Sequence, residues 1–201
     1  MATLQATTIQ TGVLQATSGA AATPFLTKTG DTDTGIYRSA ANEVSISTSG
    51  SQRVRLNSTG YFRQFNIPVL DCSHSAAIDY TDVLLTSANF YDSIFINNGN
   101  HFNASTGRFT VPVSGCYLFS FHSNTASTGP VMNVRLRING VANTGDGVEC
   151  YNQSGSTASG SSVLADTIFN VSAGDYFDVQ CARIKTQGGA QHCRMLIYQI
   201  Q

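Results

Sequence analysis

Apolar and polar side chains alternate in short runs along much of the chain. In the run 116–123, three aromatic residues share one parity: Tyr117, Phe119 and Phe121. Successive side chains of a strand point to opposite faces, so this run predicts a strand with an aromatic face directed at a core. Further candidate strands, separated by turn residues, are 78–85, 93–96, 109–112, 131–138, 163–171, 176–182 and 194–200. Many short strands without a helical period predict an all-β sandwich or jelly roll.

A second pattern of alternation lies nearer the N-terminus. Four apolar residues share one parity, Val44, Ile46, Val54 and Leu56, whereas serine and arginine occupy the other parity at 45, 47, 53 and 55. Gly50 and Ser51 separate the two runs, and Gly60 follows them. The pattern predicts a β-hairpin with one apolar face. With the turn-rich run 30–38 before it, this hairpin defines a predicted stalk module over residues 30–65.

The first 29 residues are dominated by Thr, Ser, Ala and Gly. Leu4-Gln5-Ala6-Thr7 recurs as Leu14-Gln15-Ala16-Thr17. Such a repeat is expected of a fibrous segment in which each copy meets its counterpart in neighbouring chains or lies on a host surface. The alternative is a disordered tail with chance similarity. We expect residues 1–29 to form an extended anchor, and residues 66–201 to form the head.

Composition narrows the classes of function. Charged residues make up 11% of the chain, less than half of the usual ~25%, yet 11 Phe and 8 Tyr argue against disorder. The net charge of −1 and the absence of a basic run exclude a typical nucleic-acid-binding protein. No apolar stretch is long enough for a membrane span. The run 1–5 lacks the features of a signal peptide, so we expect synthesis in a cytosol.

The cysteines, histidines and acidic residues form no recognisable catalytic pattern in the sequence, so we do not expect an enzyme. The five cysteines contain no CxxC pair and are expected to be buried free thiols, with Cys181–Cys193 or Cys72–Cys116 bridges as alternatives. The four histidines are scattered, and no Cys/His nucleophile pair is predicted, because His122 and Cys116 lie far apart along one strand. Weak calcium candidates are Asp31, Asp33, Asp146 and Glu149, although two carboxylates fall short of the 6–8 oxygen ligands of Ca²⁺ and Asx turns are the favoured explanation of the first two. No cofactor is expected, and the polar loop 152–162 is a candidate binding loop.

The second half of the chain resembles the globular head of complement C1q. The motif T-G-x-F followed by x-x-P-x-x-G-x-Y-x-F and a further aromatic residue is present as Thr106, Gly107, Phe109, Pro112, Gly115, Tyr117, Phe119 and Phe121. The runs 171–177 and 195–198 resemble later parts of that head. The resemblance implies a ten-stranded jelly roll like that of tumour necrosis factor, assembled as a homotrimer. It also implies core or trimer roles for Phe109, Tyr117, Phe119, Phe121, Phe177 and Tyr198, and turn roles for Gly107, Gly115 and Gly174.

The stalk module resembles a different group of proteins, the fibres of tailed bacteriophages. Gly30-Asp31-Thr32-Asp33-Thr34-Gly35-Ile36-Tyr37-Arg38, followed by a hairpin that ends in Arg53-Val54-Arg55-Leu56 and Gly60, matches a module common in those fibres. The resemblance implies a virion protein made in the bacterial cytoplasm and displayed on the virion surface. Its expected partners are two more copies of itself, other capsid or tail proteins through the N-terminal segment, and a host cell-surface glycan or protein.

These features lead to one principal hypothesis and several alternatives. The chain is expected to be a non-enzymatic, trimeric fibre or capsid decoration protein with an all-β, C1q-like head on an extended β-rich stalk. The alternatives are a tail-fibre receptor-binding tip and a soluble C1q/TNF-like ligand-binding module outside a virion. An enzyme such as a polysaccharide depolymerase lacks a recognisable carboxylate pair. Neither nucleic acid nor insertion into a membrane is expected.

Overall fold

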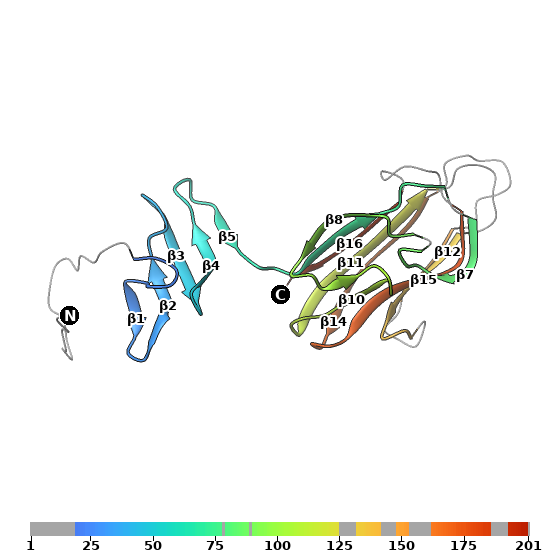
Figure 1. Cartoon of the computed structure of the whole chain (residues 1–201). Coiled ribbons are helices and arrows are strands. Elements are labelled where there is room, and N and C mark those ends of the chain that lie inside the picture. The colour runs from blue at the N-terminus through green and yellow to red at the C-terminus, as the bar shows by residue number, and fades with distance from the viewer. Residues whose placement is uncertain are drawn as a thin grey trace. The chain divides into compact units, whose positions relative to one another are not determined.

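The computed structural model shows two units, formed by residues 1–66 and 67–201 (Figure 1). The structure describes residues 19–77, 79–88, 90–124, 132–141, 148–152, 162–185 and 193–200. All regular secondary structure in these ranges is β. Within them, no helix has the length and hydropathy needed to cross a bilayer. The division after Asn66 lies one residue from the predicted boundary after residue 65.

The N-terminal unit is a five-stranded antiparallel meander in which each strand pairs with the next along the chain. Its strands are β1 (Leu26–Lys28), β2 (Asp31–Tyr37), β3 (Val44–Thr48), β4 (Ser51–Leu56) and β5 (Phe62–Gln64). The predicted hairpin is present as β3 and β4, with Val44 opposite Leu56 and Ile46 opposite Val54. The sheet also includes β1, which the sequence placed in the anchor segment, because Leu26 pairs with Ile36 of β2.

In the N-terminal sheet the polar face is buried and the apolar face is exposed, the reverse of what is usual for a sheet in water. Ser45 and Ser47 are completely buried, whereas Val44 and Ile46 on the other face are 52% and 42% exposed. The loop between β2 and β3 bonds to the serine face through Ser39, whose hydroxyl lies 2.8 Å from that of Ser45. The predicted apolar face therefore exists, but in the single chain it faces outward.

The head is a sandwich of two antiparallel sheets, which Figure 1 shows stacked face to face. One sheet has the order β14-β11-β16-β6-β8. The other has the order β13-β12-β15-β10-β9. Strand β10 pairs with the first residues of β15, and β7 pairs with the later residues of β15, from Gln180 to Lys185. The bounds are β6 (Val69–Ser73), β7 (Asp79–Leu84), β8 (Ser93–Asn98), β9 (Phe102–Asn103), β10 (Arg108–Thr110), β11 (Gly115–Asn124), β12 (Met132–Ile138), β13 (Val148–Asn152), β14 (Ser162–Val171), β15 (Tyr176–Lys185) and β16 (Cys193–Gln199).

Most head strands were predicted from alternation, and the differences have a simple cause. The described part of the head contains 11 strands, against the ten implied by the resemblance. Alternation did not reveal β6, because its residues Leu70, Asp71, Cys72 and Ser73 are all buried. A strand covered on both faces carries no clear period of two.

The core fills the space between the two sheets with aromatic side chains. Tyr117, Phe119 and Phe121 of β11 are completely buried, as the alternation predicted. Phe177 of β15 comes from the opposite sheet, and its ring centroid lies 5.2 Å from that of Phe119 and 6.1 Å from that of Tyr117. Burial of each ring stabilises the fold by roughly 1.5–3 kcal/mol.

All three predicted turn glycines have a positive φ, and Gly107 also lies in tight surroundings. Gly107 has φ 66°, and a Cβ at this position would lie 1.8 Å from the carbonyl oxygen of Leu85. Gly174 has φ 94°, and its amide donates to the Val111 carbonyl at 2.9 Å. The third, Gly115, has φ 154° at the start of β11. A side chain at 107 would therefore require the backbone to move.

Candidate functional site

The outer face of the sheet β14-β11-β16-β6-β8 carries the largest group of exposed apolar side chains placed together by register in the head. Leu118 of β11 lies opposite Ile168 of β14 on one side and Tyr198 of β16 on the other. Leu164 lies on the same face of β14, opposite His122. The exposed fractions are 61% for Leu164, 60% for Ile168 and 37% for Tyr198. We call this surface the outer head face.

One ion pair crosses the outer head face. Arg194 of β16 pairs with Asp71 of β6, its Nε donating to Oδ1 at 2.7 Å and its Nη2 to Oδ2. The guanidinium also lies 5.3 Å from the ring centroid of Phe95, which is 54% exposed. The hydrogen bond to Asp71 raises the pKa of Arg194, which keeps the guanidinium charged. The pair neutralises itself, which suits a surface that meets another protein.

The structure places five of the six sequence-predicted aromatic residues in the core and one outside it. Phe109, Tyr117, Phe119, Phe121 and Phe177 are each at most 1% exposed. Tyr198 is not a core residue: it lies on the outer head face. The reason is strand parity, because Met195 and Ile197 of the same strand point inward and Tyr198 must then point outward. Parity within 193–199 could have predicted this.

On the other sheet, a buried carboxylate is held by an arginine. Asp178 of β15 is completely buried and accepts hydrogen bonds from Arg137 Nε at 2.6 Å and Arg137 Nη2 at 2.9 Å. Arg137 also donates to Gln180 at 3.1 Å. Arg108 lies farther from Asp178, at 3.9 Å, and its guanidinium lies 4.2 Å from the Tyr176 ring centroid. Because the Arg137 guanidinium donates two hydrogen bonds to the Asp178 carboxylate, we interpret this site as structural rather than catalytic.

The turns around Asn139 and Asp175 are bonded to each other. The Asn139 amide donates to Asp175 Oδ1 at 2.9 Å, and its oxygen accepts from the Tyr176 amide at 3.0 Å. Asp175 Oδ2 accepts from the Ser172 amide at 2.8 Å. The hydrogen bond from Asn139, then that from Ser172, lowers the pKa of Asp175. The turn after β12 and the turn before β15 are therefore fixed together.

Of the candidate metal ligands, the structure describes the side chains of Asp31 and Asp33. Asp31 and Asp33 lie in β2 and are exposed, rather than in an isolated turn. Asp146 lies outside the described residues, as do the side chain of Glu149 and most of the loop 152–162. Over the described ranges, no group of three or more His, Cys, Asp and Glu side chains is arranged to hold a metal ion.

The described histidines occupy separate environments. His74 stacks on Phe90 with ring centroids 5.2 Å apart, and its Nδ1 lies 3.3 Å from Oδ2 of Asp92. His101 packs edge-on against Phe109. His122 shares β11 with Cys116, six positions apart in the strand. His192 lies outside the described residues. Among the residues that the structure places, His122 and Cys116 do not form a nucleophile–base pair, because they lie six positions apart in the strand.

Four of the cysteines are described, and all four are free thiols. Cys72, Cys181 and Cys193 are buried, and Cys116 is half-buried. Neither alternative bridge, Cys181–Cys193 or Cys72–Cys116, is formed. Burial raises the pKa of the Cys72 and Cys181 thiols, which keeps them protonated and poorly nucleophilic.

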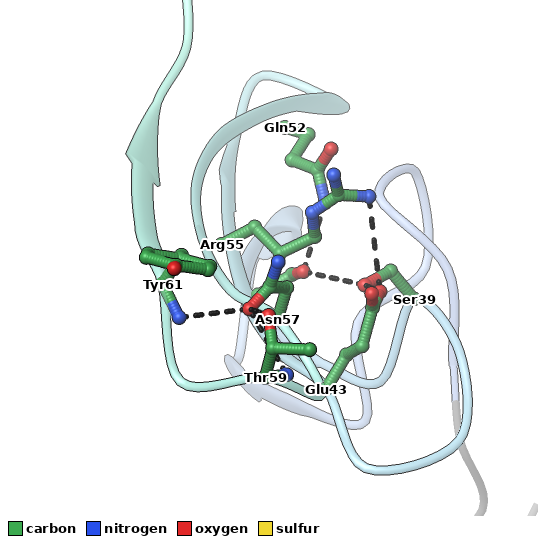
Figure 2. Close-up of polar contacts among 8 residues, drawn as sticks. Ser39, Glu43, Gln52, Arg55, Asn57, Thr59 and Tyr61 are labelled. Carbon is green, nitrogen blue, oxygen red and sulfur yellow. Dashed lines mark hydrogen bonds and ion pairs between the residues drawn. The ribbon is translucent and has the colours of Figure 1, made fainter.

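The N-terminal unit contains a polar network on its buried serine face, shown in Figure 2. Ser39 donates to Glu43 at 2.7 Å, Gln52 donates to Ser45 at 2.8 Å, and Arg55 Nη1 lies 3.8 Å from Glu43. A buried polar group is tolerated best when it is hydrogen-bonded. Ser39, Ser45, Glu43 and Gln52 bond to one another, whereas the buried Nε of Arg55 has no hydrogen-bond partner among the described residues.

The turn between β4 and β5 is fixed by one side chain, also shown in Figure 2. The Asn57 Oδ1 accepts from the Thr59 amide at 3.2 Å, the Thr59 hydroxyl at 2.9 Å and the Tyr61 amide at 2.8 Å. Short side chains of this kind replace backbone partners in turns. The side-chain hydrogen bonds of the network and of this turn indicate that the N-terminal unit is a folded unit and not a flexible linker.

Comparison with known structures agrees with the jelly-roll architecture. The Eiger TNF of S. frugiperda is 12% identical, with a TM-score of 0.51 over 68% of this chain and 94% of that chain. Murine APRIL at pH 5.0 is 14% identical, with a TM-score of 0.50 over 67% and 99%. The globular domain of the zebrafish complement 1qA protein is 15% identical and covers 67% and 98%, with a TM-score of 0.48. At these identities the likeness shows the fold alone.

Comparison with curated protein sequences finds no match. Residues 75–175, half of the chain, match the C1q domain family. The match includes the motif from Thr106 to Phe121 on which the resemblance was based. It also includes the turn at Gly174. The chain therefore belongs to the C1q domain family.

Proposed function

We propose that this protein is a non-enzymatic, homotrimeric structural protein on the exterior of a tailed-phage virion. In this proposal the N-terminal segment binds capsid or tail proteins, and the C1q head projects as a fibre or decoration that meets the host surface. The exposed apolar side chains of the outer head face are the observation that supports the proposed trimer. The resemblance of residues 30–60 to phage fibre modules carries the location.

The outer head face has the properties of a surface buried between subunits. Leu164 and Ile168 of β14 and Tyr198 of β16 are exposed in the single chain and lie on one face of the sheet, on either side of β11. Contiguous apolar surface on a soluble protein marks an interaction site, because its exposure to water is unfavourable. A threefold axis would bring three identical faces together and close the assembly without leaving a free one. The trimers implied by the C1q resemblance have this symmetry.

The virion location rests on the N-terminal unit. The motif shared with phage fibres forms the turn before β2, the whole of β2 and the β3–β4 hairpin. These strands form a unit separate from the head. Such a unit suits a spacer between a virion anchor and a projecting head. We propose synthesis in the bacterial cytoplasm, display on the virion, and adhesion to a host glycan or protein through the head.

Family membership also favours a second candidate function. C1q domains are typically binding modules and not enzymes, so a soluble C1q/TNF-like ligand-binding module outside a virion is consistent with the head. A tail-fibre receptor-binding tip is the variant of the virion proposal that differs in location. The candidates differ in where the protein is found, which makes them separable by microscopy.

Immunogold electron microscopy tests the location. Antibodies raised against the purified full chain would be applied to phage particles from a culture that produces it. We expect gold on the capsid for a decoration fibre and at the tail end for a receptor-binding tip. Particles without label, together with soluble chain in the same culture, would contradict the virion proposal and favour the soluble module. Particles from a deletion strain provide the control for antibody specificity.

A further inference from the structure

The N-terminal unit presents an apolar sheet face that the described residues of this unit, 19–66, leave exposed. Register places two rows across it, one through β1 to β5 and one through β3 to β5. The first row is Leu26, Ile36, Ile46, Val54 and Gln64, and the second is Val44, Leu56 and Phe62. We call these eight residues the apolar stalk face. Its exposed fractions reach 57% at Leu26 and 69% at Phe62.

The opposite side of the same sheet is the interior of the unit. Ser45 and Ser47 are completely buried there and Tyr37 is 5% exposed. The ring of Phe65 covers part of this side, with the guanidinium of Arg63 4.7 Å from its centroid. An isolated sheet in water is expected to bury its apolar side and expose its serines. Here the serine side is buried and the apolar side is exposed. The apolar stalk face therefore has the composition of a protein core but is exposed to solvent in the single chain.

We infer that the apolar stalk face packs against the same face of other copies of this chain. The three N-terminal sheets of one trimer would then enclose a shared apolar core, with their polar sides outward. The inference rests on the trimer in the proposed function, but it concerns a different surface in a different unit. It gives the stalk an assembly role of its own.

Charge favours another copy over a foreign partner. All eight residues of the apolar stalk face are described, and none is charged. A partner with charged groups at this face would bury them unpaired, which is strongly unfavourable. The identical face of another copy brings the same eight uncharged side chains, and the Arg53 guanidinium on this side of the sheet already donates to Thr48 at 2.7 Å.

Tethering and symmetry favour another copy as well. The N-terminal unit passes directly into the head, because the boundary falls between Asn66 and Ile67. Heads that form a trimer would hold three stalk faces at an effective concentration on the order of millimolar. A foreign protein would have to cover three identical faces, whereas a threefold arrangement covers all three at once.

Cysteine crosslinking in the assembled full chain tests the inference. Ile46→Cys places a thiol in the centre of the apolar stalk face. Ala41→Cys is the matched control, because Ala41 is exposed in the loop whose Ser39 and Glu43 bond to the polar side. Each variant and the natural chain would be treated with a short bismaleimide, and covalent dimers would be measured on a denaturing gel. Sedimentation equilibrium of the same samples before treatment would give the assembly state.

We expect both variants to remain trimers and Ile46→Cys to form at least about five times more covalent dimer than Ala41→Cys or the natural chain. A trimer in which Ile46→Cys crosslinks no more than the control would overturn the inference and leave the trimeric head intact; this is the outcome if another virion protein covers the face. A natural chain that sediments as a monomer would overturn both the trimer and the inference.

Discussion

At the scale of single residues, the least replaceable charge is the Asp178 carboxylate. It is completely buried between strands of the head, and the fork of Arg137 supplies two hydrogen bonds to it. A buried ion pair adds little net stability, because desolvation offsets the attraction between the charges. Removal of one partner of the pair is strongly destabilising, because the other charge is then left buried and unpaired in a low dielectric.

We therefore predict that Arg137→Ala lowers the free energy of unfolding by about 3–5 kcal/mol. Arg108→Ala is the comparison, because Arg108 lies 3.9 Å from Asp178, is 45% exposed and stacks on Tyr176. Its loss is expected to cost about 1 kcal/mol or less. Urea unfolding at one protein concentration measures both values. Equal costs for the two variants would contradict the assignment of Arg137 as the main partner of Asp178.

At the scale of elements, the head depends on turns that bond to each other. The Asn139 side chain connects the turn after β12 to the turn before β15 through Asp175 and Tyr176. The hydrogen bonds that Asp175 accepts favour its charged form, so its pKa is lowered in the folded state. Such a carboxylate contributes stability above its unfolded pKa, and this contribution is lost as the pH falls through its folded pKa.

This gives a pH-dependent prediction for Asp175→Asn. The variant keeps the shape of the side chain but has no charge to titrate, so it should be slightly less stable than the natural chain at pH 7. The difference should shrink as the pH falls below about 4, where Asp175 of the unfolded natural chain becomes protonated, and it should vanish once the pH lies below the lowered pKa of the folded state. Thermal unfolding from pH 7 to pH 2.5 measures the two curves. A difference that stays constant over this range would show that the charge of Asp175 is not involved.

Alternation along the sequence was sufficient for the elements that bury one face. It predicted β11, β14 and β16 within one or two residues, because each has one side on the core and one side outside. It did not reveal β6, which is buried on both sides, or β9, which has only two residues. It also could not show the bulge in the β3–β4 pairing, which moves Gln52 to the side of Ser47.

At the scale of the whole molecule, the outer head face is expected to decide the assembly state. A lysine placed at the centre of a subunit interface would be buried without a partner, which is unfavourable by several kcal/mol. In the single chain, Leu164 and Ile168 are largely exposed, so the same substitutions should not disturb the folded subunit.

We predict that the double variant Leu164→Lys/Ile168→Lys dissociates to a folded monomer of 21.4 kDa at micromolar concentration. Its subunit affinity should fall more than about tenfold. Val141→Lys is the control, because Val141 is 50% exposed in the turn after β12 and lies off the outer head face. Sedimentation equilibrium and far-UV circular dichroism measure assembly and folding. A stable trimer of the double variant would place the trimer interface elsewhere.

The sequence by itself determined the all-β class, the aromatic core face of β11 and the C1q family motif. These are properties of local order: parity follows from neighbouring residues, and the motif places glycines where the backbone needs a positive φ. The same local order predicted that the β3–β4 hairpin has one apolar face.

Only the tertiary structure decided what each face meets. Of the core and trimer roles that the C1q resemblance implied for Tyr198, it excluded the core, and it covered the serine side of the N-terminal sheet while leaving the apolar side exposed. Parity says which side chains share a face, but the loops and strands that cover that face come from distant parts of the chain. In this protein, the faces left uncovered indicate where other copies are expected to bind.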